Sequence, residues 1–130
     1  MSLLCLATAT AVVTLSASSF TLAWTHSIEK VRWEEDYRIE GDRLHAVEAR
    51  VMGSAAGMEP APDARLEHGW WRYKPEKAWH DELRLTRSTF TAEYELCFGG
   101  RCRSLAEIAP QAEGVTRVYP CGGAPSKPRD

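Results

Sequence analysis

Apolar and polar residues alternate along most of the chain, whereas the spacing of an amphipathic helix is rare. Strands are therefore expected over residues 3–15, 19–26, 32–40, 43–52, 65–74, 82–87, 90–98, 101–105 and 115–119. Only residues 76–82 and 105–112 could hold a helical turn. This spacing predicts an all-β fold, either an antiparallel β-sandwich or a small barrel, with about eight or nine short strands.

The sharpest local pattern runs from Phe20 to Ile39. It contains two segments whose apolar faces are each interrupted once, by His26 in the first and by Glu35 in the second. A hairpin closed around Lys30 and Val31 would place His26 opposite Glu35. In the same register, Trp24 would face Tyr37 and Leu22 would face Ile39.

A carboxylate bonded to an imidazole suits three roles: a general base, a metal ligand with its supporting partner, or a proton-linked switch. The alternative is a structural pair, in which two polar groups satisfy each other and fix the register of the hairpin. Ser27 follows His26 directly and therefore points to the opposite face, so the two do not indicate a nucleophile and its base.

Other chemistry-bearing residues favour surface roles. Glu29, Glu34 and Asp36 flank the hairpin turn with Glu35, and nearby Lys and Arg residues offset their charge, which is typical of a solvated rim. The remaining histidines, at positions 45, 68 and 80, match no metal-ligand spacing. Trp70 and Trp71 must point to opposite faces of a strand, and an outward ring could anchor a partner protein.

A long connection follows the strand that ends near Met52. Residues 53–62 combine small side chains with two prolines, so this segment suits neither a strand nor a helix. It is either a functional loop, containing Gly57, Met58 and Glu59, or a plain surface crossover. We expect residues 1–122 to form a single β domain and residues 123–130 to be a disordered tail.

Charge and composition argue against nucleic-acid binding and against a membrane-spanning segment. The formal net charge is −2, and no basic stripe is present to neutralise phosphates, which argues against nucleic-acid binding. Ser and Thr interrupt the apolar opening segment before it reaches the ~20 residues that span a bilayer, so no transmembrane segment is expected. The first charged residue is Glu29. The opening segment is therefore either a secretory signal or a β-hairpin, and its poor cleavage site favours the hairpin.

Four cysteines are present, and two of them share a short hairpin. In Cys97-Phe-Gly-Gly-Arg-Cys102 the two glycines supply a tight turn, which sets Cys97 opposite Cys102 at disulfide distance. A second disulfide joins Cys5 to Cys121 if the termini lie side by side. Two disulfides would indicate an oxidising compartment. Free thiols remain the alternative, and the spacing does not favour a metal site.

Several motifs together resemble a known family. They are FTLAWTHSIEKVRWEED from Phe20, EARVMGSAAGMEP from Glu48, Gly-Trp-Trp from Gly69, and LCFGGRCRSL from Leu96. In combination they are similar to the small bacterial family of domains of unknown function numbered eighteen-fifty. Members are typically encoded beside TAXI-type TRAP transporters, which import solutes with an extracytoplasmic solute-binding protein. The resemblance implies an accessory role at the outer face of the inner membrane and no established catalytic role.

Two features depart from that family. Relatives often carry Gly-Ser-Gly-Ala-Gly where this chain has Ala55 as the third residue of the motif, so a glycine-only backbone angle is not expected there. Many relatives also carry an N-terminal export or anchor segment. Because no clear export signal is present here, either the start lies upstream or another export route is used.

These observations predict a non-enzymatic accessory or interaction subunit of a TAXI-type TRAP system for organic acids, in the periplasm or at the outer face of the inner membrane. Its partners would be the TRAP membrane subunit, the solute-binding protein, or both, and no cofactor is expected. The alternative is a small-ligand or metal-binding module, possibly an enzyme, built on His26, Glu35 and Glu59. The candidate interaction residues are His26, Ser27, Glu29, Trp33, Glu34, Glu35, Gly57, Met58, Glu59 and Trp71.

Overall fold

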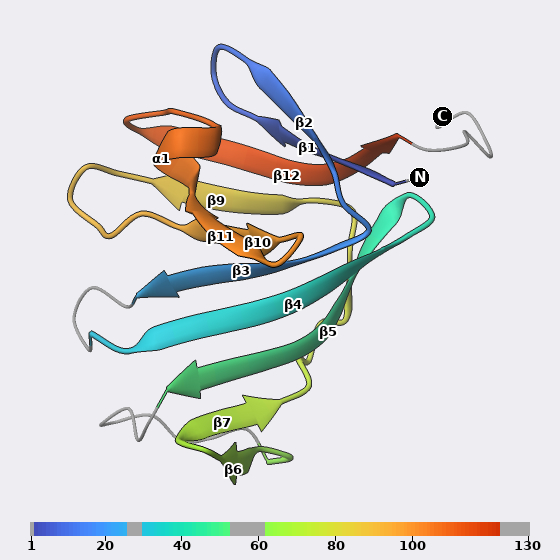
Figure 1. Ribbon diagram of the computed structural model, residues 1–130, viewed down its shortest axis with the longest axis vertical. Coiled ribbons are helices and arrows are strands. Elements are labelled where there is room, and N and C mark those ends of the chain that lie inside the picture. The colour runs from blue at the N-terminus through green and yellow to red at the C-terminus, as the bar shows by residue number, and fades with distance from the viewer. Residues whose placement is uncertain (1, 26–29, 53–61, 123–130) are drawn as a thin grey trace.

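The computed structural model describes residues 2–25, 30–52 and 62–122. Twelve antiparallel strands form two sheets that pack as a sandwich, and within the described residues the sheets do not close into a barrel (Figure 1). One short helix, α1 (Leu105–Ile108), follows β11. The prediction of an all-β sandwich is therefore confirmed.

The larger sheet has the order β11-β10-β3-β4-β5-β7-β6, with β8 paired to β5 beside β7. Its strands are β3 (Ser19–Thr25), β4 (Arg32–Glu40), β5 (Arg43–Met52), β6 (Arg65–Glu67), β7 (Trp70–Tyr73), β8 (Trp79–His80), β10 (Glu95–Phe98) and β11 (Arg101–Ser104). Gly41 and Asp42 make the tight turn between β4 and β5, because Glu40 pairs directly with Arg43 and Gly41 has a φ of 68°.

The smaller sheet has the order β2-β1-β12-β9. Its strands are β1 (Leu3–Ala7), β2 (Val12–Ser16), β9 (Leu83–Arg87) and β12 (Gly114–Gly122). Leu4 and Leu6 of β1 are fully buried, so the opening segment forms the predicted hairpin and contributes to the core. No helix in the described residues is long and apolar enough to cross a membrane.

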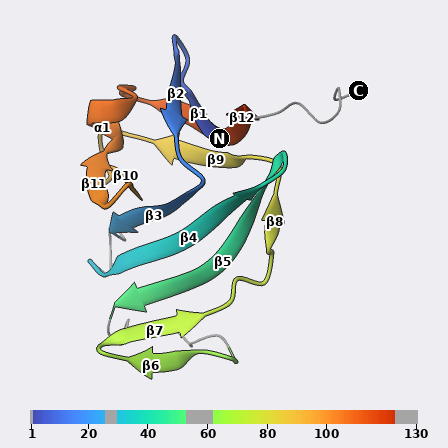
Figure 2. The same cartoon turned by 45° about the vertical axis from the view of Figure 1, so that its right-hand side comes forward.

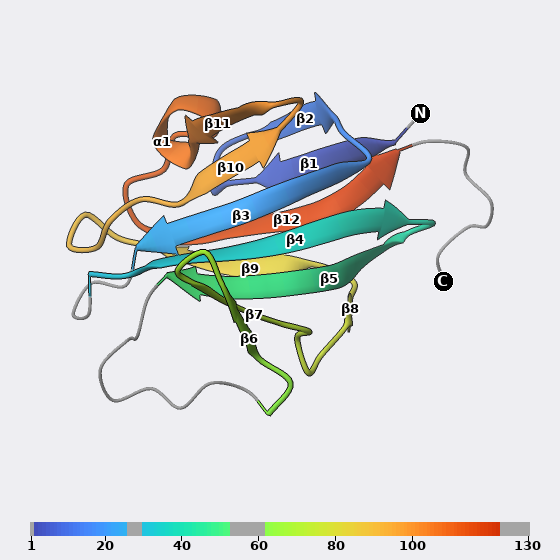
Figure 3. The same cartoon turned by 60° about the horizontal axis from the view of Figure 1, so that its bottom comes forward.

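The shared core lies between the smaller sheet and one part of the larger sheet. Leu4, Leu6 and Val118 pack there against Phe20 and Leu96, and α1 closes one end. Strands β7 and β6 project away from β1, β2 and β12 in all three views (Figures 1, 2 and 3). The inner face of the larger sheet, which is the face toward the core, therefore continues beyond the area that the smaller sheet covers.

Both predicted disulfides are present. Cys5 joins Cys121 where β1 and β12 lie side by side, with a Cα–Cα distance of 5.7 Å. Cys97 joins Cys102 across the β10–β11 hairpin, whose Gly99 and Gly100 both have positive φ angles. The described cysteines are all disulfide-bonded. Two disulfides indicate an oxidising, extracytoplasmic compartment.

Two strand predictions were wrong in extent. The segment 65–74 divides into β6 and β7 at a turn that includes Gly69. The predicted strand 90–98 begins only at Glu95, and Phe90 is 90% exposed. The carboxylate of Glu93 instead pairs with the buried guanidinium of Arg87, the last residue of β9, at 2.8 Å.

Candidate binding surface on the larger sheet

The structure separates the candidate residues that it describes onto two faces of the larger sheet. Trp33, Glu35 and Trp71 lie on the inner face, and Glu34 lies on the outer face. Six other candidates lie outside the described residues: His26, Ser27, Glu29, Gly57, Met58 and Glu59. Trp70 alternates with Trp71, as expected, and both rings are partly buried.

The predicted register of the β3–β4 hairpin was wrong, although the predicted faces were right. Glu35 lies opposite Leu22, whereas the tight-turn register set Glu35 opposite residue 26. The observed register stacks Phe20 on Tyr37 at 5.2 Å between ring centroids. Trp24 likewise stacks on Trp33 at 6.1 Å. The register differs by an even number of residues, so every side chain keeps its face.

An apolar row crosses five strands of the inner face. Adjacent pairs in the ladders are Trp24 with Trp33, Trp33 with Val51, Val51 with Trp71, and Trp71 with Leu66. We call these five residues the aromatic row. Val51, in the middle of the row, is 5% exposed, whereas Trp24, Trp33 and Trp71 are partly exposed and Leu66, at the sheet edge, is 57% exposed. The row is therefore most open where it reaches the sheet edge.

Glu35 lies in the neighbouring row of the same face, between Leu22 and Ala49, which are both buried. Its Oε1 accepts a 2.6 Å hydrogen bond from the hydroxyl of Tyr37. Burial raises the pKa of Tyr37 far above its usual range, and the charge and hydrogen bond of Glu35 raise it further. Tyr37 is therefore a permanent donor to the carboxylate.

Two further tyrosines lie within the electric field of Glu35. Burial is the main cause of the raised pKa of Tyr73, and the charge of Glu35 adds to it. Burial also raises the pKa of Tyr94, with smaller contributions from Glu93 and Glu35. Tyr94 packs against Trp24 at 6.2 Å between centroids. A carboxylate is thus surrounded by aromatic rings on a half-buried surface.

No sequence pattern indicated a role for His80, which lies beside this cluster. His80 of β8 packs edge-on against Tyr37 at 6.0 Å between ring centroids. Its pKa is lowered first by burial and then by the charge of Lys77, and the charge of Glu35 opposes this shift. Because β8 has only two residues, no alternation was available to reveal this position.

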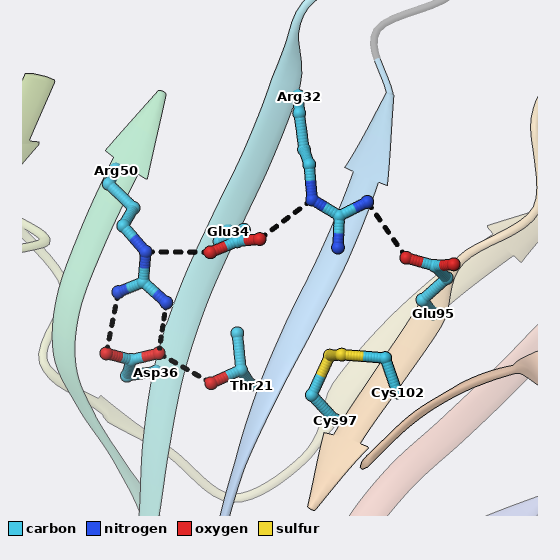
Figure 4. The surroundings of a disulfide bond; sticks show 8 residues. All are labelled: Thr21, Arg32, Glu34, Asp36, Arg50, Glu95, Cys97 and Cys102. Atoms are coloured by element: carbon cyan, nitrogen blue, oxygen red, sulfur yellow. Dashed lines mark hydrogen bonds and ion pairs between the residues drawn. A yellow bond between two sulfur atoms is a disulfide. The ribbon is translucent and has the colours of Figure 1, made fainter. Parts of the chain in front are cut away.

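The outer face carries a continuous network of ion pairs (Figure 4). Arg50 bonds Asp36 with both terminal nitrogens, at 2.8 and 3.0 Å, and bonds Glu34 through Nε at 2.8 Å. Thr21 donates a 2.6 Å hydrogen bond to Asp36. Arg32 bridges Glu34 and Glu95. Strands β10, β3, β4 and β5 are therefore tied together across this face.

A groove of about 510 Å³ lies beside this network, between the β3–β4–β5 surface and the hairpin that holds the Cys97–Cys102 disulfide. Thr21, Asp36 and Arg50 line its floor. These three polar groups already bond one another, so they offer a ligand little that is unsatisfied.

Acidic residues on the two faces differ in their partners. Every acidic residue of the larger sheet that points outward pairs with an arginine: Glu34, Asp36, Glu40, Glu48, Glu67 and Glu95. Over residues 2–25, 30–52 and 62–122, Glu35 is the single acidic strand residue of the inner face, and it has no ion-pair partner there. The described residues contain no group of three potential metal ligands.

Comparison with known proteins places this chain in a family without an assigned activity. Residues 20–105 match the family described as "Domain of unknown function (DUF1850)". No curated protein and no solved structure matches the chain. The matched region contains both faces of the β3–β4–β5–β7 sheet and the Cys97–Cys102 hairpin. The chain therefore belongs to the DUF1850 family.

Proposed function

We propose that this protein is a non-enzymatic accessory domain that docks, outside the cytoplasm, onto a subunit of a TAXI-type TRAP transport system for organic acids. The resemblance in sequence supports the link to the transporter. The two disulfides support an extracytoplasmic location. The docking partner is the membrane subunit or the solute-binding protein.

The aromatic row is the observation that carries this proposal. Aromatic side chains on an open surface are the usual anchors of protein–protein contacts, because they bury a large area with little loss of conformational freedom. Trp33, Val51, Trp71 and Leu66 lie outside the core that the two sheets share. Leu66 and Trp71 at the sheet edge are the residues that a partner would reach first.

The test is capture of purified partner subunits by the immobilised domain. Wild-type protein is expected to retain the membrane subunit or the solute-binding protein. The double variant Leu66→Ser/Trp71→Ala is expected to reduce retention at least tenfold, because it removes the exposed end of the aromatic row. Val12→Ser is the matched control, since Val12 is 59% exposed on the smaller sheet. Failure of the wild-type domain to retain either subunit would contradict the proposal.

A second candidate function is a small-ligand or metal-binding module that uses Glu35. The observation that favours it is the cluster of Glu35, Tyr37 and His80 on a half-buried surface. His26 and Glu59, the other residues of this hypothesis, lie outside the described residues. A bound transition metal in the purified protein, or a large thermal stabilisation by an organic acid, would favour this function over docking.

A further inference from the structure

We propose that Glu35 and the rings beside it form a subsite for an organic cation, namely the side chain of an arginine or lysine of the protein that docks on the aromatic row. This inference rests on the proposed docking function and adds the chemistry that the partner must present. It assigns Glu35 a binding role.

The first argument is the missing counter-charge of Glu35. A carboxylate taken partly out of water normally gains an arginine, a lysine or several N–H donors as partners. The outward-pointing acidic residues of the same sheet follow this rule, whereas the described partner of Glu35 is one tyrosine hydroxyl. A partner's cation would supply the missing charge.

The second argument is the electronic character of the surrounding rings. The faces of Trp and Tyr rings attract cations, most strongly where water is excluded. Trp24 and Trp33 lie nearly parallel, with an interplanar angle of 8°, and Tyr94 leans on Trp24 at 55°. All three side chains are partly exposed. The carboxylate and the ring faces therefore both favour a positively charged ligand.

The same chemistry argues against other ligands. An organic acid would be repelled by Glu35 and by the ring faces. A hard metal ion prefers several oxygen ligands at once, and Glu35 belongs to no described group of three potential ligands. A guanidinium group fits best, because it is weakly hydrated, stacks on aromatic rings and donates to a carboxylate. Within the described residues, Oε2 of Glu35 accepts no hydrogen bond, so it can receive one.

The direct test uses N-acetyl-arginine amide as the probe and tryptophan fluorescence as the readout. We expect saturable binding in the millimolar range, because a single side chain lacks the rest of the docking interface. N-acetyl-citrulline amide, a neutral analogue of similar shape, should bind at least fivefold more weakly. Equal binding of the two probes would overturn the inference.

Two variants test whether the arginine probe binds at Glu35. Glu35→Gln keeps an acceptor for Tyr37 and removes the charge, so arginine binding should fall at least fivefold. Glu95→Gln makes the same chemical change on the outer face of the sheet, where Glu95 pairs with Arg32, and should bind the probe like wild type. Unchanged binding by Glu35→Gln would overturn the inference. Thermal unfolding of both variants verifies that they are folded.

Partner capture separates this inference from the docking proposal. If Glu35→Gln retains the partner as well as wild type while Leu66→Ser/Trp71→Ala loses it, the docking surface stands and the cation subsite is wrong. If the arginine probe binds but neither transporter subunit is captured, the docking proposal and the assignment of the cation to that partner are overturned. Loss of capture in both variants supports both proposals.

Discussion

The two faces of the larger sheet handle three consecutive acidic residues in opposite ways. Glu34 and Asp36 point outward, and both bond the guanidinium of Arg50. Glu35 points inward between them, where it accepts a hydrogen bond from Tyr37 and has no described ion-pair partner. Strand alternation alone produces this separation.

We expect the charged residues of the outer face to stabilise the sheet and Glu35 to contribute little to its stability. The outer network joins four strands through charge-assisted hydrogen bonds, so its members should contribute to the free energy of unfolding. An unpaired, half-buried carboxylate contributes little or costs stability. We propose that Glu35 serves binding, and substitutions on the two faces should therefore differ in their effects.

Removing Arg50 should produce the largest effect. The side chain of Arg50 is 14% exposed, and Arg50→Ala would leave Glu34 and Asp36 without their shared cation. Loss of one partner from a buried ion pair leaves an uncompensated charge, so we expect a loss of about 2–4 kcal/mol in the free energy of unfolding. Urea denaturation measures it. Arg65→Ala is the control and should cost less than about 0.5 kcal/mol, because the side chains of the Arg65–Glu67 pair are 67% and 44% exposed.

Asp36→Asn should have the next largest effect. We expect the free energy of unfolding to fall by about 1–2 kcal/mol at pH 7, because the variant weakens the hydrogen bonds that the Asp36 carboxylate accepts from Arg50 and Thr21. Burial of Asp36 acts to raise its pKa, but these hydrogen bonds outweigh burial and hold the pKa below 3.8. A carboxyl group whose pKa is lower in the folded state than in the unfolded state stabilises the fold at pH values above its unfolded-state pKa. That stability is lost as pH falls through the folded pKa.

The pH dependence provides a separate check on Asp36. The wild-type protein should lose stability below about pH 4, and Asp36→Asn should lose less over the same range, because its amide does not titrate. Urea denaturation at pH 7, 4 and 3 measures this difference. Parallel curves for the two proteins would show that the outer carboxylate does not stabilise the fold.

Glu35→Gln should have the smallest effect on stability. The amide oxygen still accepts from Tyr37, and the uncompensated charge is removed, so the free energy of unfolding should stay the same or rise by up to about 1 kcal/mol. A loss of more than about 1 kcal/mol would mean that Glu35 is structural. The same urea denaturation at pH 7 gives this value.

The sequence predicted those parts of the fold in which local chemistry determines the outcome. The boundaries of β4 and β5 were confirmed, because the alternating pattern and the Gly41-Asp42 turn define them. The Cys97–Cys102 hairpin was confirmed for the same reason, since two glycines determine its turn. The faces of Trp33 and Glu35 also followed from alternation.

Contacts distant in sequence account for what was missed. Alternation fixes the face of a residue but not its partner across the ladder, so the register of β3 on β4 depended on the stacking of Phe20 with Tyr37 and of Trp24 with Trp33. The strand expected over residues 90–98 was too long, because Glu93 pairs with Arg87 and β10 begins only at Glu95. The ion pairs of Arg50 with Glu34 and Asp36 likewise require β5 to be aligned with β4, which no local pattern specifies.

One paired measurement tests the central claim that the outer face stabilises the sheet and the inner face binds the partner. Unfolding free energy and capture of the transporter subunits are measured for Glu35→Gln and Asp36→Asn, which make the same type of change at adjacent positions. We predict that Asp36→Asn loses stability and keeps capture, whereas Glu35→Gln keeps stability and loses capture. The reverse pattern, or a parallel loss of both properties in both variants, would contradict the account.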